Sequence, residues 1–380
     1  MQRVVVGRAV FDGARLLPNV ALVIEDGQIA DLIPANHAPA DARKHDGVIV
    51  PGLIDLQVNG GGGIWVGANT TAGTLGRICE THMTLGSTGC LPTLITDSPE
   101  ITTSVLAAGV EAARRKLPGF LGLHIEGPHL DPRRKGAHDE ALIRPMQDED
   151  LDRLCAAARA LPALMVTLAP EAVRHDQIAA LARAGVIVSL GHSDCSQEVA
   201  QAAMHAGARC ATHLFNAMSQ IGNRAPGLAG AVLASDCAAG LIADGIHVHP
   251  TTMRLALAAR RHGIFLVSDC MALAGTNAQQ IALHGRIIRR EKGRLTLIDG
   301  TLAGADLTLP GAVRVLIEQV GIPAERALAM ASSIPADVIG LGATHGRIAP
   351  GRSADLLLLS PDYHPVSVCR GGEWFKARER

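Results

Sequence analysis

The chain has 380 residues, of which 48% are hydrophobic but only 2% are aromatic, so its core must be built from aliphatic side chains. Its 35 basic and 36 acidic residues give a formal net charge of -1, without any block of lysine and arginine. This charge pattern excludes an electrostatic surface for nucleic acid or for an anionic membrane, and a small molecule is the expected substrate.

The eight cysteines are spread without a C-x-x-C pair, and several lie in apolar runs where reduced thiols pack like small hydrophobic side chains. The first residues do not resemble a signal peptide. No apolar stretch approaches the roughly 20 residues that a membrane-spanning helix needs. We therefore expect a cytoplasmic protein in a reducing compartment.

The two ends of the chain have the alternating pattern of β-strands. Val20 to Ile33 contains two apolar runs separated by Asp26-Gly27, a pair that favours a type I′ hairpin turn. Near the other end, short strands are predicted within residues 346–359 and 365–374. Because neither end can bury a sheet alone, residues 1–50 and 345–380 are predicted to pair into one small β-sandwich.

Residues 51–344 repeat a different pattern, in which an apolar strand is followed by a loop and a helix of about 10 to 18 residues. Eight strands are predicted, at Leu53 to Val58, Gly89 to Leu94, Leu121 to Ile125, Met165 to Leu168, Val186 to Leu190, Cys210 to His213, Leu241 to Ala243 and Ile264 to Ser268. Eight parallel strands close a barrel. The sequence thus predicts an α/β fold, a (β/α)8 TIM-like barrel beside the small β-sandwich.

Helices are expected between these strands. Ser98 and Pro99 are an N-cap and a first-turn proline that open a helix to Lys116. Further helices are predicted over Ser196 to His205, Thr251 to His262 and Ala305 to Val320. Residues 280–298 are predicted to form a β-hairpin insertion that turns near Lys292-Gly293 and overhangs the barrel mouth.

Side chains that can bind a metal stand at the ends of three predicted strands: Glu126 after the third, His192 after the fifth and His213 after the sixth. In a parallel barrel the carboxyl ends of all strands open on one face, so these residues converge although they are far apart in sequence. Two imidazoles and a carboxylate with an open fourth position are typical of one catalytic divalent ion. Zinc is favoured, and iron or another divalent ion is the alternative.

Each of these residues alone has an ordinary structural explanation, because the chain contains 16 histidines and most need no special role. Because a possible metal ligand stands at each of three strand ends, a metal site is favoured. Asp269, after the eighth predicted strand, adds a carboxylate that can take a proton from water and pass it to a leaving group. The alternative interpretation is structural: Asp269 would be a helix N-cap or the first residue of a hairpin. Together the four residues indicate a hydrolase.

Several motifs carry a resemblance to a known family. They are P-G-L-I-D-L-Q-V-N-G-G-G-G at 51–63, H-I-E-G-P-H-L at 124–130, K-G-A-H at 135–138, G-H-S at 191–193, T-H-L-F-N-A-M at 212–218, G-N-R-A-P-G-L-A-G at 222–230, I-A-D-G-I-H-V at 242–248, S-D at 268–269 and the terminal G-R-I-A-P-G-R-S-A-D-L. Nearly end to end, the chain resembles the N-acetylglucosamine-6-phosphate deacetylase family of the amidohydrolase superfamily. The resemblance implies hydrolysis of N-acetylglucosamine 6-phosphate to glucosamine 6-phosphate and acetate, in amino-sugar catabolism.

The first motif bears on the number of metal ions. Many amidohydrolases carry H-x-H at the end of the first strand and bind two metals, whereas this chain has Gln57 and Asn59 there. Neutral amides are poor ligands for a second zinc beside Glu126. One metal ion is therefore expected, and Gln57 and Asn59 are assigned to hydrogen bonding at the site.

The resemblance also implies roles for residues outside the metal set. His138 would polarise the acetyl carbonyl and stabilise the oxyanion, although without the resemblance it is better interpreted as a surface loop residue. Asp269 would act first as the base and then as the acid. The sugar pocket would be formed by Ala137, His138, Asn216, Ala217, Asp244, His247, Leu302, Ala303 and Gly304, with Gln57 and Asn59 beside them.

The phosphate end of the substrate is assigned to His247 and Arg224, because the forked donors of a guanidinium match a phosphate group. In the family this arginine reaches across from a neighbouring subunit, which implies a homodimer with Arg224 acting across the interface. Arg224 is otherwise interpreted as a solvated loop residue. The sequence does not distinguish supply in cis from supply in trans.

Two segments depart from the family pattern, Cys270-Met271 after the aspartate and His129-Leu130 after E-G-P, and both could tune which acetamido sugar fits. One alternative function is deacetylation of another acetamido-sugar phosphate, such as N-acetylgalactosamine 6-phosphate. A cyclic amidase or an N-acyl amino acid deacylase is a second alternative and would need no phosphate site. A non-catalytic scaffold is a third and would be expected to lack one of the four site residues, all of which are present.

Overall fold

The computed structural model describes residues 2–283 and 285–378. Eight parallel strands form the centre of its larger part, in the order β8-β11-β12-β13-β14-β15-β16-β17. They are β8 (Leu53–Val58), β11 (Ser87–Ile95), β12 (Leu123–Glu126), β13 (Leu164–Leu168), β14 (Ile187–Leu190), β15 (Cys210–Ala211), β16 (Ala238–Leu241) and β17 (Ile264–Leu266). Each overlaps one of the eight predicted strands, so the barrel prediction is confirmed.

The first and last strands of the barrel meet at their carboxyl ends. Val58 and Cys270 form a parallel bridge. The Asp269 amide donates to the Gln57 carbonyl over 3.0 Å, and the Asn59 amide donates to the Cys270 carbonyl over 2.9 Å. The sheet is therefore a nearly closed barrel, in which the residues that follow β8 and β17 are neighbours.

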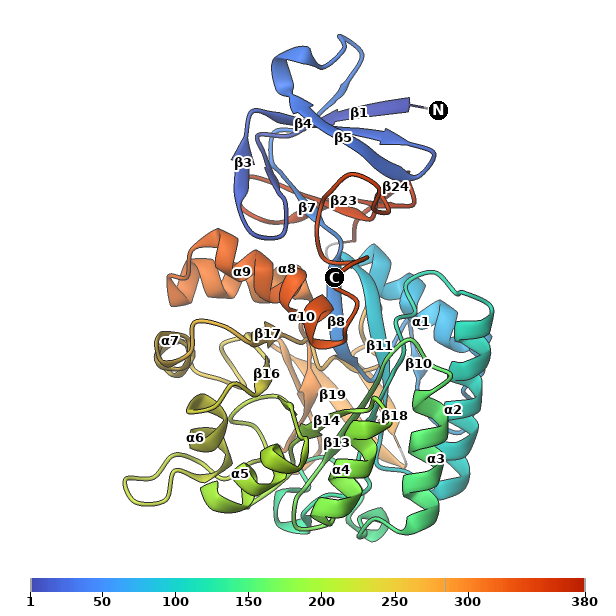
Figure 1. Cartoon of the computed structure of the whole chain (residues 1–380), viewed down its shortest axis with the longest axis vertical. Helices are drawn as coiled ribbons and strands as arrows, with labels where there is room; N and C mark the ends of the chain where they lie inside the picture. The colour runs from blue at the N-terminus through green and yellow to red at the C-terminus, as the bar shows by residue number, and fades with distance from the viewer. Residues whose placement is uncertain (1, 284, 379–380) are drawn as a thin grey trace.

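Helices cover the outside of the barrel (Figure 1). They are α1 (Ala72–Thr84), α2 (Pro99–Arg114), α3 (Asp148–Ala158), α4 (His175–Arg183), α5 (Gln197–Ala206), α6 (Gly227–Leu233), α7 (Pro250–Ala259), α8 (Leu309–Val315), which continues as a π-helical turn (Leu316–Val320), α9 (Ala324–Ala331) and α10 (Ser333–Val338). Ser98 caps α2 as predicted, because its Oγ accepts a hydrogen bond from the Ile101 amide. None of the helices in the described parts of the chain is long and apolar enough to cross a membrane.

The helix predicted over Ala305 to Val320 does not begin at Ala305. The Ala305 amide donates to the Asp269 carbonyl over 2.8 Å, so this residue extends a strand instead. The helix α8 begins at Leu309, where Thr308 Oγ1 accepts from the Gly311 amide. A side-chain cap four residues later than expected therefore sets the helix start.

Two further sheets form a small β domain from the two ends of the chain, above the barrel in Figure 1. One contains β1 (Gln2–Val6), β4 (Val20–Glu25), β5 (Gln28–Pro34) and β6 (Arg43–Lys44); the other contains β2 (Ala9–Phe11), β3 (Leu16–Pro18), β7 (Val48–Pro51), β22 (Leu356–Leu359), β23 (Pro365–Arg370) and β24 (Glu373–Lys376). Asp26 and Gly27 turn between β4 and β5 with φ of 48° and 80°, as a type I′ turn requires. Buried aliphatic residues from both ends of the chain, among them Val5, Leu22 and Leu356, pack together between the sheets.

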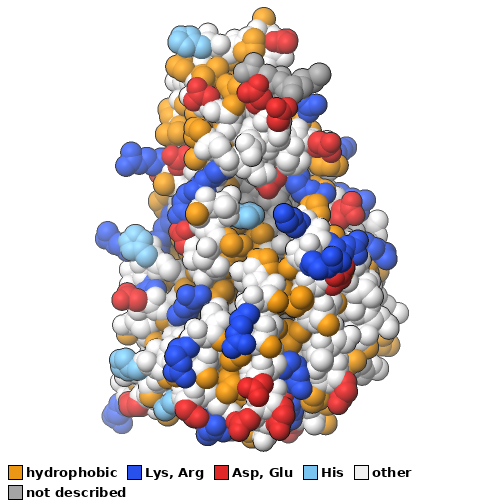
Figure 2. Space-filling model, turned by 45° about the vertical axis from the view of Figure 1, so that its right-hand side comes forward, with side chains coloured by type: hydrophobic (Ala, Val, Ile, Leu, Met, Phe, Trp, Pro, Cys, Tyr) orange, Lys and Arg blue, Asp and Glu red, His pale blue; other side chains and the backbone are white. Residues whose placement is uncertain are grey.

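The insertion near residues 280–298 is larger than the predicted hairpin. It is a four-stranded antiparallel sheet of β18 (Gln280–Leu283), β19 (Arg286–Glu291), β20 (Arg294–Thr296) and β21 (Leu302–Ala305), which we call the insertion sheet. The turn at Lys292-Gly293 is confirmed by the pairing of Glu291 with Arg294. The predicted range includes β18, β19 and β20, but it stops before β21. Residues of both outer strands, Leu283 and Ala303, pack on the chain that follows β17, a long-range contact that strand alternation does not reveal. Figure 2 shows that basic and acidic side chains are interspersed over one face of the molecule.

Candidate active site

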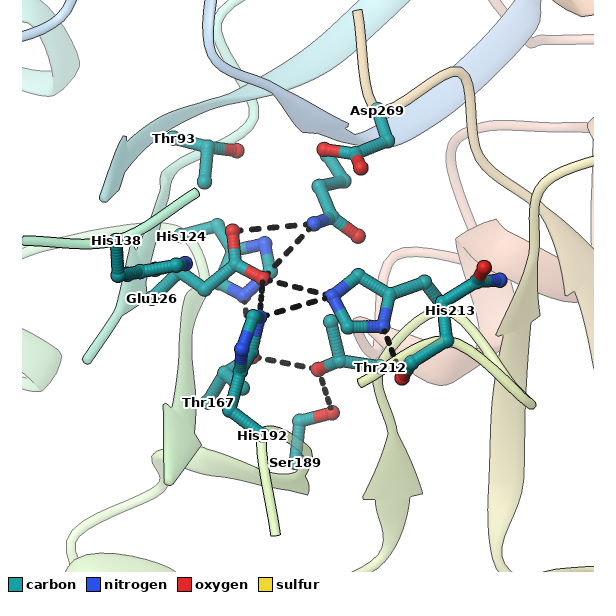
Figure 3. A network of polar contacts seen from close by, with 12 residues as sticks. Thr93, His124, Glu126, His138, Thr167, Ser189, His192, Thr212, His213 and Asp269 are labelled. Atoms are coloured by element: carbon teal, nitrogen blue, oxygen red, sulfur yellow. Dashed lines mark hydrogen bonds and ion pairs between the residues drawn. The ribbon is translucent and has the colours of Figure 1, made fainter. Parts of the chain in front are cut away.

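Four polar residues at the carboxyl ends of barrel strands face one another (Figure 3). Glu126 is the last residue of β12, and His192, His213 and Asp269 follow β14, β15 and β17. The three residues that follow strands have φ of 47°, 31° and 48°, a left-handed conformation that costs free energy in residues other than glycine. The chain therefore turns sharply as each strand ends, which directs these side chains over the barrel mouth.

Three of these residues bring their ligand atoms together. The Nε2 atoms of His192 and His213 lie 3.2 and 3.0 Å from Glu126 Oε1, and 3.1 Å from each other. All three side chains are buried. They make up a group in which every potential ligand atom lies within 4.8 Å of the others.

The hydrogen bonds of the two imidazoles decide which nitrogen carries the proton. His192 Nδ1 lies 2.8 Å from the Arg134 carbonyl, and His213 Nδ1 lies 3.1 Å from the Asn216 carbonyl. A carbonyl only accepts, so each Nδ1 donates, and each neutral ring keeps a lone pair on Nε2. Two lone pairs and a carboxylate oxygen thus face one another in a buried space. That arrangement is repulsive without a cation and fits a divalent metal ion.

Gln57 and Asn59 each hydrogen-bond a carboxylate of the site. Gln57 Nε2 lies 3.1 Å from both oxygens of Glu126, and Asn59 Nδ2 lies 2.8 Å from Asp269 Oδ1. Both amides therefore donate to the protein's own carboxylates and orient them. Gln57 thus contacts both oxygens of the Glu126 carboxylate.

Asp269 borders the cavity and has a raised pKa. Burial and, second, the negative charge of Glu126 raise its pKa to about 6, although His213 and Asn59 favour the charged form. A carboxyl group with a pKa closer to neutrality exchanges protons more readily under physiological conditions. The position of Asp269 therefore suits proton transfer.

His138 lies beside the ligand set, with its ring centroid 4.4 Å from that of His192. Its Nδ1 lies 2.7 Å from Thr96 Oγ1 and accepts a hydrogen bond from the Thr96 backbone amide over 3.3 Å. An amide only donates, so Nδ1 carries no proton and Nε2 does. Burial and, second, the neighbouring His192 lower the pKa of His138 to about 3, which favours this neutral form.

These residues border a cavity of about 250 Å³. Of the predicted site residues, those that line it are Asn59, Glu126, Ala137, His138, His192, His213, Asn216, Ala217, His247, Asp269, Leu302 and Gly304. Asp244 stands behind His247, with its Oδ2 2.6 Å from His247 Nδ1. Burial opposes ionisation of Asp244, but the hydrogen bond and charge interaction with His247, together with the backbone amides of His247 and Ile246, lower the pKa of this carboxyl. Ala303 is fully buried in the apolar cluster under the insertion sheet.

Sequence reasoning did not assign four residues that line the cavity to the site: Ile95, Gly136, Ile242 and Thr301. It did single out Met271, which also lines the cavity, as a departure from the family pattern. Ile95 is the last residue of β11, so its place at a strand end could have indicated it. Gly136 belongs to the K-G-A-H motif and approaches the ring of His192, since a Cβ there would lie 3.4 Å from Cε1. Nothing in the local sequence indicated Thr301.

Arg224 lies elsewhere. It is exposed on the loop before α6, which projects from the barrel in Figure 1, and its neighbour Ile221 is 56% exposed. Within the described parts of one chain, the residues that line the cavity do not include Arg224. The fold of a single chain thus brings together the predicted metal ligands, Asp269, His138 and His247, but not this arginine.

The two departures from the family motifs fall in different surroundings. Cys270 is buried against β8, whereas Met271 borders the cavity. His129 and Leu130 are buried away from it, and His129 Nε2 lies 3.9 Å from Asp150 Oδ2. Of these four residues, Met271 is the one placed to contact a bound molecule.

Comparisons with known proteins agree with this geometry. Residues 48–375 match the model of the amidohydrolase family. The chain is 33% identical to an N-acetylglucosamine-6-phosphate deacetylase from Haemophilus influenzae, an alignment that covers 98% of this chain and 99% of that protein. The chain belongs to this family.

Other members of the N-acetylglucosamine-6-phosphate deacetylase family and their relatives extend the comparison. A Shewanella protein that is 35% identical over 97% of this chain and 94% of its own length is an N-acetylgalactosamine-6-phosphate deacetylase. The structure of the Pasteurella multocida enzyme matches with a TM-score of 0.94 and 34% identity, over 99% of this chain and 100% of that one. A mutant enzyme from Mycobacterium smegmatis, in complex with N-acetyl-D-glucosamine-6-phosphate, matches with a TM-score of 0.90 and 30% identity, over 98% and 99% of the two chains.

The ligand set predicts an effect on metal binding. Glu126→Ala removes the charged ligand, and we expect the metal content measured by elemental analysis to fall to about a tenth of the wild-type value or less. Glu198→Ala, a matched change at an exposed residue of α5, is the control and should leave the metal content unchanged. A fully loaded Glu126→Ala protein would contradict the assignment.

Proposed function

We propose that the protein uses one divalent metal ion, with zinc favoured, to hydrolyse the acetamide of N-acetylglucosamine 6-phosphate to glucosamine 6-phosphate and acetate. The observation that carries this proposal is one cavity in which a metal-ligand set meets Asp269 and His138. Amide hydrolysis needs an activated water, a group that moves its proton and a donor to the carbonyl oxygen. The names of the relatives supply the substrate class.

Asp269 moves the proton in this mechanism. A metal ion held by Glu126, His192 and His213 would lower the pKa of water and polarise the acetyl carbonyl. Asp269 takes a proton from the attacking water and later gives it to the amine nitrogen as the carbon–nitrogen bond breaks. The Asn59 amide holds Asp269 Oδ1, so the orientation of the carboxylate is set before substrate binds.

His138 stabilises the negative charge that develops on the carbonyl oxygen. The Thr96 amide donates to Nδ1, so the Nε2 proton of His138 is available for this oxygen. A neutral imidazole acts here as a hydrogen-bond donor and gives up no proton.

Asn59 provides an acceptor for the substrate. Its Nδ2 faces the Asp269 carboxylate, so its amide is oriented with Oδ1 as the remaining polar atom. This oxygen is buried, belongs to a residue that lines the cavity, and has no hydrogen-bond partner among the residues that the structure describes. A buried acceptor without a donor is costly. The N–H of the substrate acetamide is a donor of the right type, and we assign it to this oxygen.

The phosphate group is assigned to His247 and to Arg224 of a second copy of the chain. His247 borders the cavity, and its ring is oriented by Asp244. The exposed position of Arg224, beside the exposed Ile221, supports supply from a second copy rather than from the same chain. A homodimer is therefore part of the proposal, and remote contacts to phosphate would fix the reacting geometry.

The configuration of the sugar needs a direct comparison, because relatives named for the gluco and galacto sugars are 33% and 35% identical to this chain. We expect acetate release with the highest kcat/KM from N-acetylglucosamine 6-phosphate. Free N-acetylglucosamine should be slower by about 100-fold or more, because the phosphate contacts are lost. A higher kcat/KM for N-acetylgalactosamine 6-phosphate would show that the galacto sugar, rather than the gluco sugar, is the preferred substrate. An equal kcat/KM for free N-acetylglucosamine would contradict the proposed phosphate site.

The role of Asp269 is tested by Asp269→Asn, which keeps the size of the side chain but cannot take up a proton. We expect kcat to fall by about 100-fold to 10,000-fold, the range typical of general acid–base groups. Metal content should stay at the wild-type value, since Asp269 is outside the ligand set. Wild-type turnover by this variant would exclude Asp269 as the base.

Supply of Arg224 in trans is tested by mixing two inactive variants, Arg224→Ala and Asp269→Asn, under conditions of subunit exchange. In a heterodimer, one of the two sites then has both native groups. Equal mixing should restore about a quarter of the wild-type activity, since half of the dimers carry one competent site. No recovery despite demonstrated exchange would indicate supply in cis.

A further inference from the structure

The insertion sheet is firmly attached to the barrel next to the cavity. Its buried residues Leu283, Ile288 and Leu295 pack against Met271 and Leu273, which follow Asp269 in the chain. Hydrogen bonds add to this apolar packing between the sheet and the barrel. Arg290 donates to the Leu273 and Thr276 carbonyls over 2.7 Å each, and Trp65 Nε1 donates to the Ala282 carbonyl over 3.1 Å. The sheet is therefore a fixed support rather than a loose flap.

One residue of this sheet contacts another segment that lines the cavity. The guanidinium of Arg286 on β19 donates to the Ala137 carbonyl over 2.6 Å. Ala137 directly precedes His138, and both line the cavity. Arg286 thus joins the insertion sheet to residues 131–138, which we call the covering segment.

The covering segment also contacts His192, one of the predicted metal ligands. The Arg134 carbonyl accepts from His192 Nδ1, and the Arg134 side chain bonds Asp194 Oδ1 over 2.6 Å. Gly136, with φ of 56°, runs against the His192 ring. His138 itself is held through its ring by Thr96. The backbone at Ala137 is held instead by Arg286 of the insertion sheet.

We propose that Arg286 is a positioning residue, which holds the covering segment against the metal centre and so places His138 for the reaction. The proposal rests on the role assigned above to His138. Without the bond from Arg286, the Ala137 carbonyl loses its partner on the insertion sheet, and the backbone on which His138 sits can move. Displacements of about 1 Å at a reacting group are enough to lower a rate by about 100-fold.

The first arm of the test needs no substrate. Amide hydrogen exchange of the metal-loaded protein is measured for wild type, Arg286→Ala and Arg289→Ala, where Arg289 is an exposed residue of the same strand. We expect exchange in residues 136–139 to accelerate about tenfold or more in Arg286→Ala only. Peptides from α4 report whether the fold is intact. Unchanged exchange in residues 136–139 would overturn the proposal.

The second arm measures kcat and KM for acetate release from the sugar phosphate. Arg286→Ala should lower kcat by about 10-fold to 100-fold and leave KM within about threefold, while Arg289→Ala behaves as wild type. In a His138→Ala background, Arg286→Ala should lower kcat by less than about twofold, because its effect acts through His138. Wild-type kcat in Arg286→Ala, or losses that multiply in the double variant, would overturn the proposal. If wild type releases no acetate from either sugar phosphate, the proposed function fails, and the exchange arm still decides whether Arg286 holds the segment.

Discussion

His192 Nε2, His213 Nε2 and Glu126 Oε1 lie 3.0 to 3.2 Å from one another. The rest of the site is arranged around this contact. The backbone carbonyls of Arg134 and Asn216 hold the protons of the two rings on Nδ1, away from the centre. Such a cluster of metal-ligand atoms is stable around a cation and unfavourable without one. The barrel makes the contact possible, because its parallel strands end on one face and the three residues follow three different strands.

A chain of buried polar side chains lies close to the candidate ligands inside the barrel. His124, two residues before Glu126 on β12, lies 3.0 Å from the Leu56 carbonyl and 2.7 Å from Thr167 Oγ1. Thr167 in turn bonds Thr212, which bonds Ser189 over 2.6 Å, as Figure 3 shows. Burial lowers the pKa of His124 to about 4, so the ring is neutral. A satisfied network of this kind restricts the strands from which the ligands project.

The division of roles between the carboxylates follows from their hydrogen bonds. Glu126 accepts from Gln57 through both oxygens and stays a ligand, while Asp269 has one oxygen held by Asn59 and borders the cavity. Histidines at positions 57 and 59 would offer ligand nitrogens instead of these amide donors. The replacement of two potential ligands by amides is thus the physical basis for expecting a single metal ion.

The sequence was sufficient for features that depend on strand order and strand ends. Eight apolar runs located the barrel strands, and their last positions indicated the ligands and Asp269 without any knowledge of contacts. Thr96 and Arg286 could not be found in this way, because each matters through a partner far along the chain, 42 and 149 residues away. The same reason explains the error at Ala305, since its amide pairs with Asp269 across the barrel mouth rather than within a helix.

Titration of the metal-free protein with zinc, with acetate release from the sugar phosphate as the readout, tests the single-metal site most directly. The site described here predicts that activity rises with added zinc and saturates at one equivalent per chain, because three candidate ligands converge at one point and amides stand at positions 57 and 59. Saturation only at two equivalents, or full activity in the protein stripped of metal, would contradict it.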